Sequence, residues 1–142
     1  MSTSTTLVAT CRVVRQGNAY QGKQGPSYAP GVSAQSVGAR GIWLGMVTID
    51  PGARTRAHYH AGHESAFYVV SGELELWFGD GLREYEIARP GDYLYIPAGV
   101  SHVAINRSAT EPVVVIGGRT DPSEQESVVL QPELDARAPS AA

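Results

Sequence analysis

Histidines are the residues of this chain best suited to chemistry, and three of its four histidines lie close together. His58, His60 and His63 are followed directly by Glu64, and His102 comes about forty residues later. Imidazole nitrogens and carboxylate oxygens are common ligands of divalent transition metals. The cluster therefore indicates a metal site. The alternative is a set of surface histidines or of core histidines whose hydrogen bonds are satisfied.

Strand geometry supports the metal site. His58 and His60 are two residues apart on a predicted strand, so both side chains project from one face of it. Gly62 permits a bend that brings Glu64 back toward the imidazoles. His102 follows a Pro/Gly turn, and a sheet that folds back on itself would set it opposite the first pair.

The elements that must position these residues are short strands. Runs rich in Val, Ile and aromatic residues alternate with turn signatures such as Asp50-Pro51-Gly52. This pattern predicts an all-β sandwich or barrel. At most one short helix is expected, near residues 122–127, because Asp121 and Pro122 are typical of a helix start. Strands are predicted at residues 7–15, 41–50, 54–60, 64–71, 73–79, 82–88, 93–96, 100–106, 112–118 and 128–130.

Length and local composition predict one domain over residues 1–142. The small, polar residues 1–6 and the tail 136–142 are expected to be flexible. Residues 16–41 are rich in Gly, Gln and Ser, which predicts a long loop or arm.

Charge and composition exclude several classes of protein. The net charge of −3 and the pI of about 5.7 disfavour a nucleic-acid-binding protein. No apolar run reaches the roughly 20 residues that span a bilayer, and the first residues do not resemble a secretory signal. Cys11 is the single cysteine, so an internal disulfide is impossible. We therefore expect a cytoplasmic protein with a small-molecule substrate, and neither nucleic acid nor membrane as a partner.

Two motifs resemble those of the cupins, small jelly-roll proteins (double-stranded β-helices) that hold a metal inside a barrel. The first begins at Gly52, continues five residues later with His58-Tyr59-His60, and reaches Glu64 after three more residues. Seven residues, in place of six, then separate Glu64 from Gly72. Ser65 stands where a longer spacing would put the carboxylate, and His63 is a possible substitute ligand.

The second motif matches without departure. Gly91 is followed after five residues by Pro97-Ala98-Gly99, then by His102 and Asn106. Two motifs in this order and at this separation are a specific signal for the fold, whereas they say little about the reaction.

The resemblance implies a cupin jelly-roll barrel and a metal site. His58, His60, Glu64 and His102 are the ligands that it implies. Three imidazoles and one carboxylate suit one divalent transition metal ion, which could be Zn, Fe, Mn, Ni or Co. The order of intrinsic affinities does not let the sequence select among these ions.

Other residues are candidates for substrate binding or proton transfer. Arg54 and Arg56 share the strand face of His58 and could hold a substrate carboxylate, or both could be solvated. His63 and Glu64 are candidate acid/base residues. Tyr68 has the alternation of Glu64 along the next strand and is expected to donate a hydrogen bond in the pocket.

These candidates favour a metal-dependent enzyme that acts on a small polar molecule. The class that is slightly favoured, because several titratable groups lie close together near the histidines, is an isomerase or epimerase that moves a proton on a carbonyl compound such as a keto acid. A second is a non-haem Fe(II) dioxygenase. A third is a binding module without catalysis. A homodimer is also expected, from Trp77 on an otherwise polar strand face, from open sheet edges and from long flanking arms.

Overall fold

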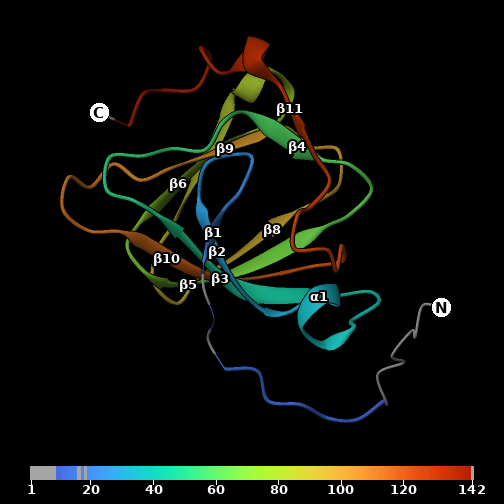
Figure 1. Ribbon diagram of the computed structural model, residues 1–142. Coiled ribbons are helices and arrows are strands. Elements are labelled where there is room, and N and C mark those ends of the chain that lie inside the picture. Colours follow the sequence, from blue (N-terminus) through green and yellow to red (C-terminus); the bar gives the residue numbers. More distant parts are fainter. Residues whose placement is uncertain (1–8, 16, 18, 142) are drawn as a thin grey trace.

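Two antiparallel β-sheets that face each other make up most of the molecule (Figure 1). The computed structural model describes residues 9–15, 17 and 19–141, and these contain one α-helix of four residues. The strands are β1 (Tyr20–Gln21), β2 (Ser27–Val32), β3 (Trp43–Ile49), β4 (His58–His60), β5 (Ser65–Ser71), β6 (Leu74–Phe78), β7 (Glu84–Ala88), β8 (Tyr93–Ile96), β9 (His102–Ile105), β10 (Val113–Arg119) and β11 (Val128–Leu130). The helical elements are α1 (Ala34–Val37) and the 3₁₀ turns η1 (Asp80–Leu82) and η2 (Pro132–Leu134).

The strand order of each sheet mixes distant parts of the chain. Sheet A has the order β1-β2-β3-β10-β5-β8, and sheet B has the order β11-β4-β9-β6-β7. Consecutive strands β4 and β5 therefore lie in different sheets, as do β7 and β8. This arrangement confirms the predicted all-β fold, and it sets β4 and β9 side by side although the chain between them crosses both sheets.

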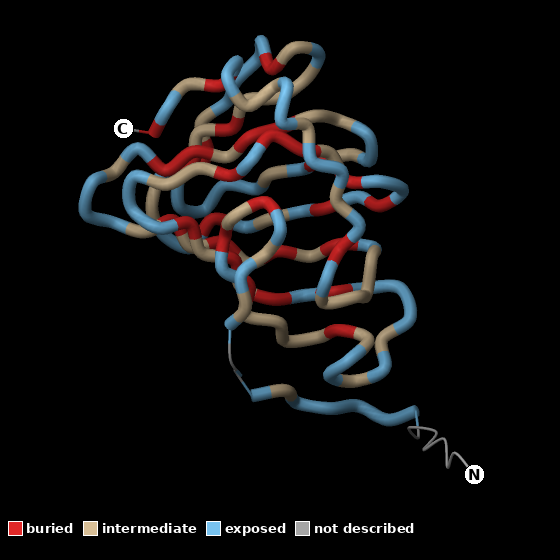
Figure 2. Tube along the Cα trace, turned by 45° about the horizontal axis from the view of Figure 1, so that its top comes forward, coloured by how far each residue is buried: buried red, intermediate tan, exposed pale blue. Residues whose placement is uncertain are grey.

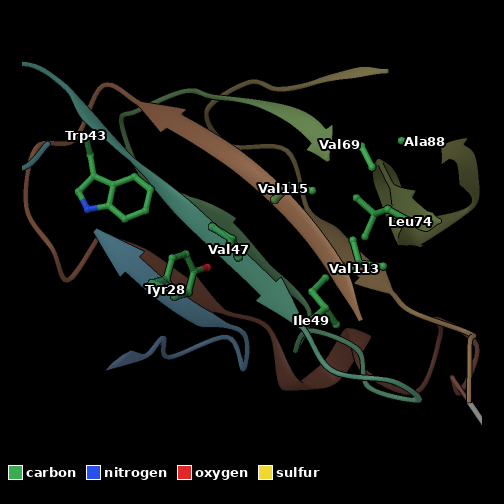
Figure 3. Close-up of a cluster of buried hydrophobic side chains, with 9 residues drawn as sticks. All are labelled: Tyr28, Trp43, Val47, Ile49, Val69, Leu74, Ala88, Val113 and Val115. Carbon is green, nitrogen blue, oxygen red and sulfur yellow. The ribbon is translucent and has the colours of Figure 1, made fainter. Parts of the chain in front are cut away.

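The core lies between the two sheets because strand side chains alternate between faces. Along β3 the buried hydrophobic residues are Trp43, Val47 and Ile49, and along β10 they are Val113 and Val115. Figure 3 shows these side chains meeting those of β5 and β6 in one cluster. Figure 2 shows most buried positions within the body of the molecule, whereas the N-terminal segment is largely exposed. At about 25 cal/mol per Å² of apolar area, this burial is the main stabilising contribution.

Strand β9 is buried on both faces. His102 faces the space between the sheets, whereas Val103 and Ile105 face outward and have no exposed surface. They pack in a second cluster with Ala138 and Ala141 from the C-terminal segment. Residues 136–141, which were expected to be loose, thus lie against sheet B, and residue 142 is outside the described residues.

The described part of the segment 16–41, residues 17 and 19–41, is not one long loop in the structure. It contains β1, β2 and α1, and β2 pairs with β3 along the edge of sheet A. Residues 9–15, part of the first predicted strand, form no strand and are largely exposed. Residues 1–6, expected to be flexible, lie outside the described residues.

The helix expected near residues 122–127 is absent from this described segment, so that prediction was wrong. The Asp121 carboxylate accepts hydrogen bonds from the backbone N–H groups of Ser123 and Ser127. The Arg119 guanidinium donates to the carbonyls of Asp121, Ser123 and Glu124. Backbone groups that a helix would pair internally are therefore satisfied by side chains. No helix in the described part of the chain is long and apolar enough to cross a membrane.

Asn106 holds the loops at one end of the barrel together, and its replacement by Ala is expected to be costly. The side chain is 1% exposed and its Nδ2 donates to the carbonyls of Ile49, Asp50 and Glu111. Asn106→Ala leaves these carbonyls short of a partner and should lower the free energy of unfolding by about 3 kcal/mol. Urea unfolding measures the change. Thr110→Ala, at an exposed position of the same loop, is the control and should change stability by less than about 0.5 kcal/mol.

Candidate metal centre

Three buried histidines converge between the sheets. His58 and His60 point inward from β4 because they are two residues apart, and His102 begins β9. The pairing of β4 with β9 sets His58 directly opposite His102. The Nε2 atoms of His60 and His102 are 3.2 Å apart, and ligand atoms of all three residues lie within 4.8 Å of one another.

Backbone carbonyls fix the orientation of two of these rings. His58 Nδ1 lies 2.6 Å from the carbonyl oxygen of Arg56, and His102 Nδ1 lies 2.9 Å from that of Val100. A nitrogen that faces a carbonyl must carry the proton, so Nε2 of each ring keeps its free lone pair. Metal-binding histidines are commonly oriented in this way. The three residues therefore fit a divalent metal ion.

Burial keeps the imidazoles of His58 and His102 neutral at neutral pH. Desolvation is the largest cause that lowers the pKa of His58, from 6.5 to about 4. Desolvation also lowers the pKa of His102 well below its ordinary value, and the neighbouring histidines lower it further. A metal binds the neutral imidazole, so at neutral pH no proton has to leave these two rings before an ion binds.

Glu126 approaches His60 from the side opposite His102. Its Oε2 lies 2.9 Å from His60 Nδ1 and 2.9 Å from His63 Nε2. Gly62, with a φ of 77°, makes the turn that brings His63 back against His60. All three side chains are buried. They form a second group of potential ligands that shares His60 with the first.

The environment of Glu126 keeps it ionised. Burial raises its pKa, but hydrogen bonds with His60 and His63 and the charges of His60 and Arg119 outweigh burial and hold the pKa well below the usual value. Gln24 Nε2 donates to Oε1 at 2.8 Å. This carboxylate is a fixed anion at neutral pH and a poor proton acceptor.

Glu64 lies outside both groups. Its side chain is exposed, and its Oε2 accepts a hydrogen bond of 2.7 Å from the Tyr95 hydroxyl. The next residue, Ser65, begins β5, faces inward and is 3% exposed. Neighbouring strand residues face opposite sides, so Ser65, the position that a longer spacing would give to the carboxylate, faces inward and Glu64 faces outward. The structure therefore does not bring Glu64 together with the histidines.

The other candidates also lie away from the histidines, apart from His63. Tyr68 is on the outer face of sheet A, with its ring near that of Tyr93. Arg54 donates to the carbonyls of Asp135, Ala138 and Pro139, and so ties the C-terminal segment to the barrel. Arg56 is exposed.

Sequence reasoning missed Glu126 and Gln24. Glu126 reaches the site because β11 pairs with β4 and sets Val128 beside His60. The run Val128–Leu130 was predicted to be a strand, but its partner was not. Once that pairing is known, the carboxylate two residues before Val128 is expected to lie near His60. Only the pairing of β11 with β4 was missing from the sequence prediction.

A small cavity of about 60 Å³ adjoins the three histidines. It has room for roughly four to six water molecules at 10–15 Å³ each. Among its described lining residues there is no Arg or Lys, and its polar lining is confined to the three histidines, Gln24, Tyr28, Thr55 and Glu126. The remaining wall is apolar and includes Val47, Ile49, Phe67, Leu74, Leu94 and Ile96.

A larger groove of about 460 Å³ lies beside this cavity, between the edge strands of the two sheets. Four residues line both spaces, namely Leu76, Leu94, Ile96 and His102. The groove adds Phe78, Pro97 and Val100 to the apolar surface. An apolar molecule too large for the cavity alone would thus find a matching surface next to His102.

Substitution of one histidine tests the metal site. His102→Ala is expected to leave a folded protein that has lost one tightly held divalent ion per chain, because one of three converging donors is removed. Glu64→Gln is the matched control and should keep its metal, since that carboxylate faces solvent. Elemental analysis after dialysis measures both. Unchanged metal content in His102→Ala, or loss in Glu64→Gln, would refute the three-histidine assignment.

The metal-free protein should lose stability in mild acid. The pKa of His58 is lower in the folded than in the unfolded chain, and so is that of His102. The unfolded state therefore takes up protons first, and the stability present above pH 6.5 is lost as the pH falls toward 4. For His58 alone the loss is about 3 kcal/mol. Urea unfolding of chelator-treated protein between pH 7 and pH 4 measures this loss. In His58→Gln the free energy of unfolding should fall less over the same range.

Comparisons with known proteins agree with this fold. The model of the cupin domain family matches residues 45–117, which are 73 of the 142 residues. A germin-like protein 3-1 of Oryza sativa subsp. japonica is 27% identical over 92 residues, which are 63% of this chain and 41% of the relative. Quercetin 2,3-dioxygenase of Bacillus subtilis is 39% identical over 51 residues, which are 36% of this chain and 14% of the relative.

Among solved structures, an oxalate decarboxylase of Bacillus subtilis studied for its Mn(II) centres is similar in fold. The TM-score is 0.64 at 19% identity, over 80% of this chain and 30% of the other. The chain thus spans less than half the length of each of these three proteins. The family match covers both histidine motifs, with His58, His60 and His102, and the expected jelly-roll architecture is the one observed. The chain belongs to the cupin family.

Proposed function

We propose that this chain is a metal-dependent dioxygenase that acts on a small, largely apolar molecule carrying an oxygen donor. The observation that carries the proposal is a three-histidine group at a cavity whose wall is otherwise mainly apolar. Three imidazoles leave further positions of a divalent ion free for other ligands. Similarity to quercetin 2,3-dioxygenase, 39% identical over 51 residues, supports this class.

The residues of the chain have three tasks in this reaction. His58, His60 and His102 hold the ion, and the carbonyls of Arg56 and Val100 keep two of the rings in place. The apolar wall binds hydrocarbon and excludes water from the reacting atoms. When bound, an ion such as Fe(II) or Mn(II) supplies the electron exchange through which O₂ reacts with an organic molecule. Both oxygen atoms then enter the substrate, so no separate reductant is needed.

Proton transfer on a keto acid, the class first favoured by the sequence, has less support. That reaction needs a cation to hold the carboxylate, whereas Arg54 binds the C-terminal segment and Arg56 is exposed. It also needs a base whose pKa lies near the working pH. The pKa of Glu126, the carboxylate in the cavity wall, is lowered instead. The same lack of a lining cation disfavours a dianion such as oxalate.

Oxygen uptake tests the proposal. Chelator-treated protein is reloaded without air with Fe(II), Mn(II) or Zn(II) and then given O₂ with catechol or quercetin as probes. We expect one O₂ consumed per substrate with Fe(II) or Mn(II), none with Zn(II), and both atoms of ¹⁸O₂ in the product. His102→Ala should lower the rate by more than about 100-fold, since even residues that only support metal ligands contribute 10–100-fold.

Other results would assign a different class. Solvent deuterium entering pyruvate in the presence of Zn(II), without oxygen uptake, would overturn the proposal in favour of proton transfer. Saturable binding of the probes without turnover under any of the three metals would indicate a binding module. Glu64→Gln serves as the matched control and should keep the wild-type rate.

A further inference from the structure

A compact group of ligand atoms lies on the far side of His60 from the three-histidine site. It consists of His60 Nδ1, His63 Nε2 and Glu126 Oε2, and each of the three distances among them is 2.9 Å. The side chains are 4–7% exposed. His60 is thus approached at both ring nitrogens, at Nε2 by His102 and at Nδ1 by this group.

Hydrogen bonds alone cannot make all three of these contacts favourable. If both nitrogens carry a proton, both can donate to Glu126, but two donors then face each other at 2.9 Å. If one nitrogen is bare, it can accept from the other, but its lone pair then faces a carboxylate oxygen that has no proton to donate. In either case one side of the triangle brings like groups together in a buried place, where such a contact is costly.

A cation would make all three contacts favourable. Nitrogen and oxygen ligands about 2.1 Å from an ion and at right angles to each other are about 3.0 Å apart. The observed distances match this spacing. Two imidazoles and one carboxylate on one face of an ion are also a common donor set for divalent first-row metals.

The surroundings of the triangle hold its members in place. Gln24 donates to Glu126 Oε1, which leaves Oε2 directed at the two imidazoles. His63 Nδ1 is buried and has no hydrogen-bond partner in the described part of the chain, and the nearest carboxylate oxygen, on Asp121, is 3.9 Å away. With a metal on Nε2, the proton of His63 would sit on Nδ1, 3.9 Å from that carboxylate oxygen.

Arg119 limits the affinity of this group for a cation. Its Nε lies 3.7 Å from Glu126 Oε2, and its guanidinium is fixed by backbone carbonyls and by the ring of Trp43. A fixed positive charge at this distance weakens binding of a second cation, although Arg119 contributes no atom to the triangle. This group should therefore fill after the three-histidine site.

We propose that His60, His63 and Glu126 form a second divalent-metal site, joined to the first through the imidazole of His60. When both sites are filled, each ring nitrogen of His60 binds one ion, and the ring gives up its N–H proton to solvent. The inference concerns metal content and does not depend on which reaction the first site catalyses.

Metal titration of the full chain tests this proposal. Chelator-treated protein is titrated with Zn(II), and bound metal is counted by equilibrium dialysis and elemental analysis. We expect two ions per wild-type chain, the second bound more weakly. His63→Ala and Glu126→Gln should each bind one ion at the wild-type high affinity, which also shows that they are folded. His102→Ala should bind one ion, and His63→Ala combined with His102→Ala should bind none tightly.

Glu64→Gln is the control for surface carboxylates and should bind two ions. One ion in wild type, with the same affinity in His63→Ala and Glu126→Gln, would overturn the second site and leave Glu126 as a residue that only orients His60. Two ions without oxygen uptake would count against the dioxygenase and leave the second site standing.

Discussion

The antiparallel pairing of β4 with β9 is the constraint on which the site depends. It places His58 opposite His102 and, through the two-residue repeat of a strand, puts His60 on the same inner face. A shift of this register by one residue would turn His58 and His60 toward the outside. Strand β9 is held in place from behind by Val103 and Ile105, which pack under the C-terminal segment. The metal-binding face thus relies on apolar packing on the opposite face of the same strand.

Electrostatic interactions hold a buried anion beside the histidines. Glu126 is a buried anion among two imidazoles, an amide and a guanidinium, and burial of a carboxylate is tolerated only with such partners. Tyr28 accepts a hydrogen bond from Gln24, so the polar network extends from the histidines into the aromatic part of the core. The cavity is therefore polar on the side of the histidines and apolar elsewhere, and this asymmetry would orient a molecule that has one oxygen-bearing end.

The sequence predicted that His58, His60 and His102 come together, because the orientation of each follows from the local strand and turn pattern. His58 and His60 share a face by alternation, and the Pro97–Gly99 turn before His102 matches the second motif without departure. Strand content and the all-β class follow from the same repeats and turns. The deviation around Ser65 was visible in the spacing, although which residue would face inward depends on how the Gly62 turn is made.

The remaining features depend on contacts between distant residues. Glu126 lies 66 positions from His60, and no local pattern states that β11 pairs with β4. The segment 122–127 has the composition of a helix start, but Arg119 and Asp121 satisfy its backbone from outside. Arg54 has the alternation of a cavity residue, but carbonyls of the C-terminal segment take its guanidinium. In each case a tertiary hydrogen bond outweighed a local preference.

The place of Glu126 in the chain also matters for assembly. The polypeptide emerges from the ribosome in order, so His58, His60 and His102 are available before residue 126 has been made. A nascent barrel could thus take up an ion with imidazoles alone and acquire its buried anion last. Trapping of the first ion would then coincide with docking of β11 against β4, the step that brings Glu126 to His60.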